Sequence, residues 1–196
     1  MTEHVAEEAD VLRAAFSNHA AESRVARVQA PTIREYEEQD RDACRALWAQ
    51  LTQWHRDLYD DQSIGGDDPA GGFDRYLEEK RPIAVWVAEL DGRVVGFTGA
   101  LPVENGVRYE LEPIVVDAAL RGRGIGDALA RAVIERAQSD GMRGVEVKPA
   151  ARNSDAIRFF HAHGFDVLGQ LELMLDLARP ERWRDGERLA GRDFRY

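Results

Sequence analysis

The chain has 196 residues, 44% of them hydrophobic and 32% charged, which suits one domain that buries a substantial core. Its formal net charge of −10 disfavours nucleic acid and anionic lipid as main partners, because both bind basic surfaces. The single cysteine, Cys44, excludes an internal disulfide and a cysteine metal cluster, so we expect no metal and a cytoplasmic location.

The two ends of the chain differ in composition from its middle. Residues 1–30 are polar and alanine-rich, and their acidic start lacks the apolar segment of a signal peptide. No apolar run approaches the roughly 20 residues of a membrane helix. We therefore predict an N-terminal extension at 1–30, one domain at 31–178 and a charged C-terminal tail at 179–196.

The first part of the predicted domain alternates between a strand and helices. A short strand is expected at 32–36, followed by a helix at 38–59 whose apolar residues recur at three- and four-residue spacing. Glycine, proline and four aspartates mark 60–72 as a loop, and 73–80 is expected to form a second helix.

The apolar period then changes to that of strands. Asp91-Gly92 is a strong signal for a hairpin with a type I′ turn, and Asn105-Gly106 marks a second tight turn. Pro113 lacks the N–H that a sheet ladder needs, so we interpret it as the marker of a β-bulge. Three antiparallel strands are predicted, at 83–90, 93–101 and 107–116.

A glycine-rich stretch, Arg121-Gly122-Arg123-Gly124-Ile125-Gly126, separates the last of these strands from a predicted helix at 127–139. Glycine lets a ligand approach the backbone, and the helix start offers free N–H groups at the positive end of its dipole. The stretch therefore predicts a phosphate site. A dinucleotide fingerprint would need glycine at Asp127, and no P-loop lysine follows. A plain strand-to-helix turn stays the alternative for this stretch alone.

The remaining elements follow in the same way. Gly141 is expected to end the helix, 144–147 to form a short strand, and Asn153 or Ser154 to cap a helix that ends at Gly164. A half-buried strand is predicted at 171–177, where alternate positions hold Leu171, Leu173, Leu175 and Leu177.

Two motifs carry a family resemblance. The spacing Arg-x-x-Gly-x-Gly resembles the acetyl-CoA signature of the GNAT superfamily of N-acetyltransferases, Gln/Arg-x-x-Gly-x-Gly/Ala. Asn153-Ser154-Asp155-Ala156-Ile157-Arg158-Phe159-Phe160, followed by Gly164-Phe165, is similar to the second family motif, Asn-x-x-Ala-x-x-Phe/Leu-Tyr. The resemblance covers roughly 32–177. It implies an α+β fold with a mixed, mostly antiparallel central sheet flanked by helices on both faces.

The resemblance also assigns roles around acetyl-CoA, the implied co-substrate. Backbone groups of Ile114, Val115 and Val116 would bond the pantetheine arm like an extra strand. Asn153 would bond the CoA chain with Phe159 packed nearby, and a helix-capping role for Asn153 is compatible with this. The backbone amides expected around the pyrophosphate are those of Arg121, Gly122, Arg123, Gly124, Ile125, Gly126 and Asp127.

Amine acetylation needs a base, because the acceptor arrives mostly as an ammonium ion. Glu110 and Glu112 share a strand face next to the cofactor run, and the family uses a glutamate at one or the other matching position. We favour Glu112, since a bulge at Pro113 would aim it at the site. The tyrosine that the family uses as general acid is replaced by Phe160, which cannot donate a proton.

The acceptor is expected to be a small-molecule amine. Asp67 and Asp68 in the acidic loop, beside Trp54 and Tyr59, suggest a cationic acceptor. A solvated acidic loop on an acidic protein is the simpler alternative. Protein N-terminal or lysine acetylation, and a non-catalytic acyl-CoA-binding module, stay open as alternatives. A homodimer is also left open.

Overall fold

The structure is a computed structural model, and it describes residues 30–103, 106–177 and 183–196. The predictions made for residues 1–29, for Asn105 and for 178–182 lie outside these residues. A five-stranded sheet in the order β1-β2-β3-β4-β5 forms the centre of the domain. Its strands are β1 (Thr32–Glu35), β2 (Ala84–Leu90), β3 (Arg93–Pro102), β4 (Arg108–Val116) and β5 (Gly144–Glu146). All neighbours are antiparallel except β4 and β5, which confirms the mixed sheet.

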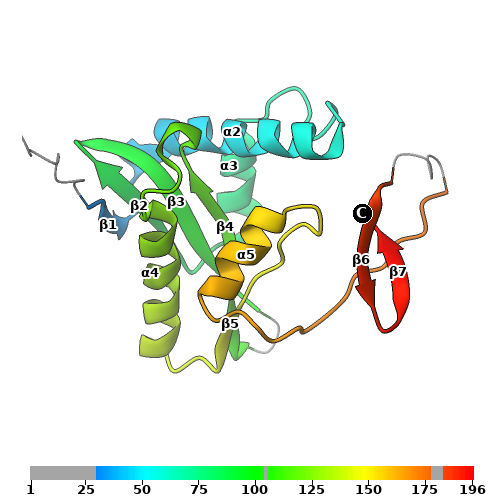
Figure 1. Cartoon of the computed structure of the whole chain (residues 1–196). Coiled ribbons are helices and arrows are strands. Elements are labelled where there is room, and N and C mark those ends of the chain that lie inside the picture. Colours follow the sequence, from blue (N-terminus) through cyan, green and yellow to red (C-terminus); the bar gives the residue numbers. More distant parts are fainter. Residues whose placement is uncertain (1–29, 104–105, 178–182) are drawn as a thin grey trace, which may run out of the picture. The chain divides into compact units, whose positions relative to one another are not determined.

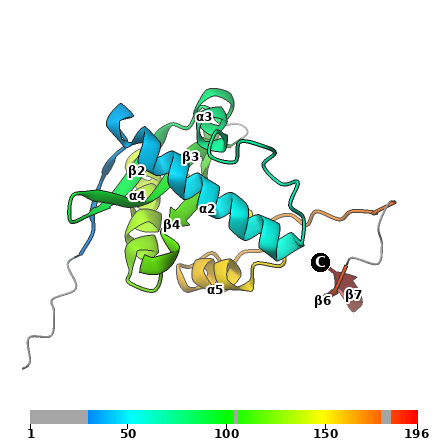
Figure 2. The ribbon, with the colours of Figure 1, turned by 90° about the horizontal axis from the view of Figure 1, so that it is seen from above.

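Helices cover both faces of this sheet (Figures 1 and 2). One face carries α2 (Arg41–Tyr59) and α3 (Gly72–Arg75), and the other carries α4 (Ile125–Ser139) and α5 (Ser154–Ala162). Short helical turns lie at Glu38–Asp40, Tyr76–Lys80 and Ala118–Leu120. Each face has its own apolar cluster, so the sheet is buried on both sides and its central strands are rich in apolar residues. None of the described helices is long and apolar enough to cross a membrane.

The hairpin predicted at Asp91-Gly92 is confirmed. Both residues have positive φ, +51° and +73°, as a type I′ turn requires. The helix ends predicted at Gly141 and Gly164 are confirmed too, at φ +69° and +86°. These elements agree with the sequence because each depends on the conformational preference of one or two residues.

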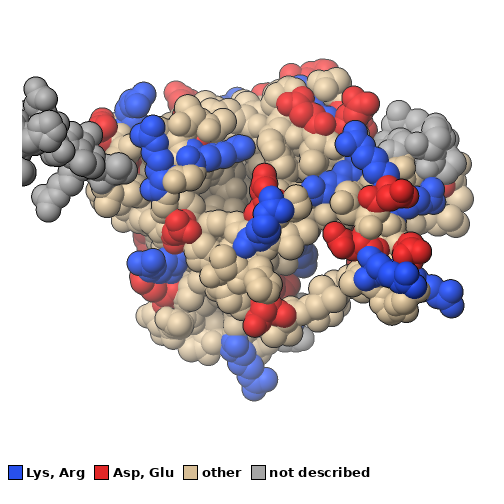
Figure 3. Space-filling model, in the orientation of Figure 1, with Lys and Arg blue, Asp and Glu red and all other residues tan. Residues whose placement is uncertain are grey.

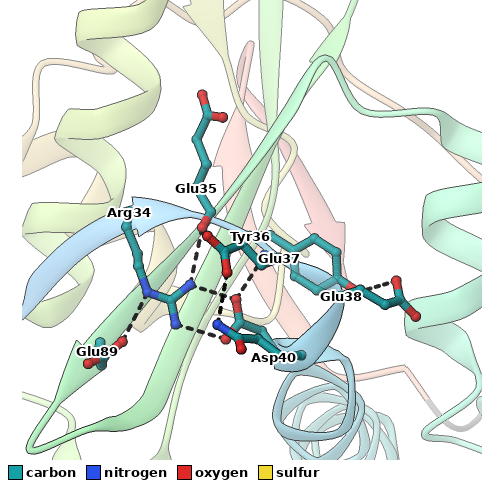
Figure 4. Close-up of polar contacts among 8 residues, drawn as sticks. Arg34, Glu35, Tyr36, Glu37, Glu38, Asp40 and Glu89 are labelled. Carbon is teal, nitrogen blue, oxygen red and sulfur yellow. Dashed lines mark hydrogen bonds and ion pairs between the residues drawn. The ribbon is translucent and has the colours of Figure 1, made fainter.

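A partly buried ion pair fixes the connection from β1 into α2 (Figure 4). The Arg34 guanidinium donates to both carboxylate oxygens of Asp40, at 2.7 and 2.8 Å, and to Glu89 on β2 at 2.9 Å. Asp40 also accepts from the backbone amide of Glu37 at 2.9 Å. These contacts hold the chain at the point where it turns into the helix, and the hydrogen bonds from Arg34 keep the pKa of Asp40 below its ordinary value.

The strand predicted at 171–177 is wrong. These residues are not paired with any described strand, and their leucines are exposed. The charged C-terminal segment also holds structure beyond the prediction, because β6 (Asp185–Leu189) and β7 (Arg192–Arg195) form a separate two-stranded sheet. Its turn, Ala190-Gly191, has φ values of +50° and +74°, so this dipeptide was the missed signal. The alternation of leucines with other residues predicts an apolar strand face, but the hydrogen-bond ladder of a sheet also needs a neighbouring strand.

Candidate functional site

A β-bulge in β4 lies at the centre of the candidate site. Thr98 pairs with Ile114 and Ala100 with Leu111, so Glu112 and Pro113 together face the single residue Gly99. This confirms the bulge predicted at Pro113. The phenol of Tyr76 donates a hydrogen bond of 2.6 Å to the carbonyl of Glu112. A Cβ atom at Gly99 would collide with that hydroxyl, so glycine is required for this contact.

Beyond the bulge, one side of β4 is open. The ladder between β4 and β5 ends at the pair Glu110–Glu146, and no described strand lies beside β4 after it on that side. The Asp117 amide donates to the Val95 carbonyl at 2.9 Å, across from β4. Because alternate residues bond in an antiparallel pair, Val115 bonds toward β3, while Ile114 and Val116 direct their backbone groups into the opening. The opening thus has the donors and acceptors of a sheet edge.

The glycine-rich loop follows directly. Gly122 and Gly124 adopt φ values of +75° and +78°, which glycine accepts without strain. The first bond into α4 is that of the Ala128 amide to the Gly124 carbonyl. Within the described residues, the backbone amides from 121 to 127 have no hydrogen-bond acceptor. This row of free donors at the positive end of the α4 dipole is suited to a phosphate group.

The second motif packs directly on the first. The ring of Phe159 on α5 contacts Gly126, where an added Cβ would lie 3.4 Å from the ring. His163 at the end of α5 places Nε2 3.0 Å from the Asp127 carboxylate and Nδ1 2.8 Å from the Phe159 carbonyl. In its protonated form His163 donates to both oxygens and offsets the negative charge of Asp127 beside the loop. Two motifs that are separate in the sequence therefore form one surface.

Of the two residues predicted to cap α5, Asn153 or Ser154, Asn153 is the cap. Its Oδ1 accepts from the Ala156 amide at 2.9 Å. The two N–H donors of the same carboxamide remain for another partner, so the capping role and the expected CoA contact are compatible. Basic and acidic side chains are interspersed over the face that carries the loop and α5 (Figure 3).

Comparison with known proteins identifies the fold and its motifs. Residues 41–165 match the model of the acetyltransferase (GNAT) family, which is more than half of the chain. The chain belongs to the GNAT family. Membership implies acetyl-CoA as the co-substrate.

Relatives of this GNAT protein bear the names of N-acetyltransferases or resemble it in fold. An uncharacterized N-acetyltransferase of Methanocaldococcus jannaschii is 34% identical over an alignment of 114 residues, and the match covers 48% of this chain and 50% of the relative. N-acetylaspartate synthetase of Danio rerio is 37% identical over 87 residues, covering 44% of this chain and 31% of the relative. The chain thus spans half or less of the length of these proteins. A solved glucosamine-6-phosphate N-acetyltransferase from Arabidopsis thaliana shares the fold, with a TM-score of 0.54 and 20% identity over 76% of this chain and all of that one.

The GNAT fold brings Glu110 and Glu112 into different surroundings. The Glu110 carboxylate accepts from the Lys148 ammonium at 2.5 Å, and this hydrogen bond raises the pKa of Lys148. Lys148 also lies 3.4 Å from Glu146. The Glu112 carboxylate has no ion pair or hydrogen bond to any described residue, and only its backbone carbonyl is held, by Tyr76. Of the two candidates, Glu112 is therefore the one whose carboxylate is available to a ligand.

The rings near Phe160 in the sequence lie in different surroundings. Phe160 is buried between Phe159 and Phe165 in the core cluster. Tyr109 donates its hydroxyl hydrogen to Asp140 at 2.6 Å, just past the last turn of α4. A helix of this length places that hydroxyl about 20 Å from the glycine-rich loop at the other end of α4. His161 is exposed on α5.

The residues predicted to bind the acceptor are only partly available. The Arg152 guanidinium lies 5.1 Å from the centre of the Tyr59 ring and covers one face of it. Asp68 accepts from the Gly71 amide at 3.0 Å and lies 3.8 Å from Arg45. Trp54 packs edge-on against His55, whose burial lowers its pKa. Asp67 is exposed. The contacts of Asp68 thus explain it as a loop-stabilising residue, and the acceptor role of the four stays a prediction.

A separate cavity of about 670 Å³ opens beside β1 and β2. Glu35, Tyr36, Arg81 and Arg136 are among the residues that line it. It contains none of the site residues predicted from the sequence, so it is not the candidate site.

Proposed function

We propose that this GNAT protein transfers the acetyl group of acetyl-CoA to a primary amine of a small molecule. The observation that carries the proposal is the open side of β4 beyond the pair Glu110–Glu146, followed by the glycine-rich loop with its free amides at the start of α4. Of the backbone groups at this opening, the Val116 carbonyl accepts a hydrogen bond of 3.4 Å from Arg121. An extended chain with amide groups can bond to Ile114 and Val116, and a pyrophosphate at its end then meets the amides from 121 to 127. When bound, acetyl-CoA supplies an activated acetyl group as a thioester.

We assign Glu112 as the general base. Its carboxylate takes a proton from the ammonium form of the acceptor, directly or through water, so that the neutral amine can attack. The bulge supports this assignment, because Tyr76 fixes the backbone of Glu112 while the side chain keeps no partner among the described residues. The Glu110 carboxylate instead accepts a hydrogen bond from Lys148, and this ion pair stabilises the junction between β4 and β5. Since Phe160 offers no proton, departure of the thiolate proceeds without a tyrosine acid.

The name of one relative, N-acetylaspartate synthetase, supports a small-molecule acceptor over a protein. Asp67 alone among the predicted acidic pair is exposed without a partner in the described structure, which is weak support for a cationic molecule.

The proposal is tested by assaying a panel of amines with acetyl-CoA and measuring the release of free thiol. The panel includes amino acids, polyamines, amino sugars and lysine peptides. With the best acceptor, Glu112→Gln should lower turnover about 10²–10⁴-fold, whereas the matched variant Glu110→Gln should lower it much less. A larger loss of turnover in Glu110→Gln than in Glu112→Gln would show that Glu110 is the general base. Transfer only to peptides contradicts the small-molecule acceptor but leaves the base assignment testable.

A further inference from the structure

The side chain of Asp127 places a negative charge at the glycine-rich loop. Asp127 lies in the first turn of α4, and a Cβ atom at Gly124 would lie 3.5 Å from its Oδ2 atom. Gly124 belongs to the row of free backbone amides that is suited to a phosphate group. A carboxylate at this place stabilises the positive end of the helix dipole, but it repels an anionic ligand that approaches the same amides. A phosphate therefore meets an opposing charge unless the carboxylate is neutralised.

His163, directly after the last turn of α5, supplies this neutralisation. Its Nε2 atom lies 3.0 Å from Oδ1 of Asp127, and its Nδ1 atom lies 2.8 Å from the Phe159 carbonyl oxygen. A carbonyl and an ionised carboxylate only accept hydrogen bonds, so the ring satisfies both contacts only when both of its nitrogens carry a proton. Within the described ranges, no lysine or arginine forms an ion pair with Asp127. His163 is thus the cationic partner that the described structure offers to this carboxylate.

The ring of His163 is held in place by the residue that packs on the loop. The ring centres of His163 and Phe159 are 4.4 Å apart, and the Phe159 ring in turn contacts Gly126. The side chain of His163 is only 22% exposed, whereas that of Asp127 is 48% exposed and open to a ligand. The packed imidazole therefore fixes the position of the carboxylate beside Gly124.

We propose that His163 is a positioning residue for acetyl-CoA, and that it acts by neutralising Asp127. This role rests on the proposed function, because the group bound at the loop is taken to be the pyrophosphate of CoA. With His163 protonated the pair carries no net charge, so the free amides at the start of α4 attract the phosphates without opposition. With a neutral residue in place of His163, the Asp127 carboxylate stays ionised beside Gly124 and repels the pyrophosphate.

Calorimetric titration of the full chain with CoA, in buffer of low ionic strength, tests this role. His163→Gln keeps a hydrogen-bond donor without the positive charge, and it should raise the CoA dissociation constant about 5–20-fold. Asp127→Asn should lower the dissociation constant about two- to fivefold, because the imidazolium then faces the phosphates without its counter-charge. The double variant carries neither charge, so its dissociation constant should return to within about threefold of that of the unaltered chain.

His161→Gln is the matched control. His161 also lies in the last turn of α5, is exposed, and forms no hydrogen bond or ion pair with the described residues of the loop. Its substitution removes an equivalent side chain from the same helix end, so the CoA dissociation constant should change less than about twofold. A higher salt concentration should reduce the loss of affinity in His163→Gln, because salt screens the repulsion between the carboxylate and the phosphates.

Three results would overturn the role of His163. Equal CoA affinity in His163→Gln and the unaltered chain shows that the charge of Asp127 does not reach the ligand. A loss of affinity that is as large in the double variant as in His163→Gln shows that His163 only supports the end of α5. Weaker or unchanged binding by Asp127→Asn contradicts the repulsion, and this variant decides even if His163→Gln fails to fold. An unaltered chain that binds no CoA refutes the proposed phosphate site itself, and the role of His163 with it.

Discussion

The hydrogen bond from Tyr76 to the carbonyl of Glu112 should couple the stability of the bulge to turnover. Tyr76→Phe removes only the hydroxyl and keeps the ring, which packs against Trp48 and Phe73. The carbonyl of Glu112 then lies in a partly buried position without its donor. Leaving such an acceptor unpaired costs about 1–3 kcal/mol, so we expect a loss of that size in the free energy of unfolding.

The effect on catalysis follows from geometry. Gly99 leaves room for the Tyr76 hydroxyl, whose hydrogen bond holds the backbone carbonyl of Glu112 within the bulge. A displacement of about 1 Å in a catalytic group can lower the rate by about 10²-fold. We therefore expect Tyr76→Phe to lower kcat about 10–10²-fold, with little change in acetyl-CoA affinity, because the amides from 121 to 127 are not altered.

Tyr109→Phe is the matched control. Tyr109 is buried to a similar degree and also makes one hydrogen bond of 2.6 Å, but to Asp140 after the last turn of α4. Its removal should change kcat by less than about twofold, and Asp140 keeps its contact to Arg136. Urea unfolding measures the free energy of unfolding, and thiol release with the best acceptor measures kcat. Equal kcat values for the two variants would refute the coupling between Tyr76 and the site.

Two further predictions concern the loop and the β1–α2 connection. Gly124→Val should abolish CoA binding in calorimetric titration, because the valine side chain would stand among the free amides of the loop. The control Gly141→Val, at a similar positive φ but at the far end of α4, should bind CoA normally. Normal CoA binding by Gly124→Val would show that the loop is not the phosphate site. Asp40→Asn should lower the free energy of unfolding by on the order of 1.5–3 kcal/mol at pH 7. Because the pKa of Asp40 is lowered in the folded state, its carboxylate stabilises the fold above about pH 4, and this stabilisation disappears as pH falls through the lowered pKa. The difference in free energy of unfolding between variant and parent should therefore vanish in acid. A difference that does not depend on pH would contradict the ion-pair explanation.

The sequence by itself determined the elements whose signals are local. The hairpin at Asp91-Gly92, the loop at Gly122 and Gly124 and the cap at Asn153 each depend on the backbone freedom or the side-chain oxygen of the residues concerned. The bulge at Pro113 belongs with them, since a missing N–H is a property of proline wherever it stands. The resemblance of two sequence motifs to those of the GNAT family then implied the fold.

Only the tertiary structure showed that Glu110 and Glu112 have different surroundings. Both stand on one strand face with apolar neighbours, and Pro113 is the one local difference between them. Lys148, which binds Glu110, is 38 positions away, and Tyr76, which holds the backbone of Glu112, is 36 positions away. The surroundings of a carboxylate are set by the strands and helices packed beside it, and those contacts are not local in the chain.

The run at 171–177 shows the same division. Alternating leucines determine that one face of the segment avoids water, whichever partner it finds. Whether it becomes a strand depends on a free edge beside it, and only the sheet order shows that such an edge remains on β5 among the described strands. The side-chain pattern is a property of the sequence, whereas strand pairing requires two backbones to meet, and that is decided only when the chain has folded.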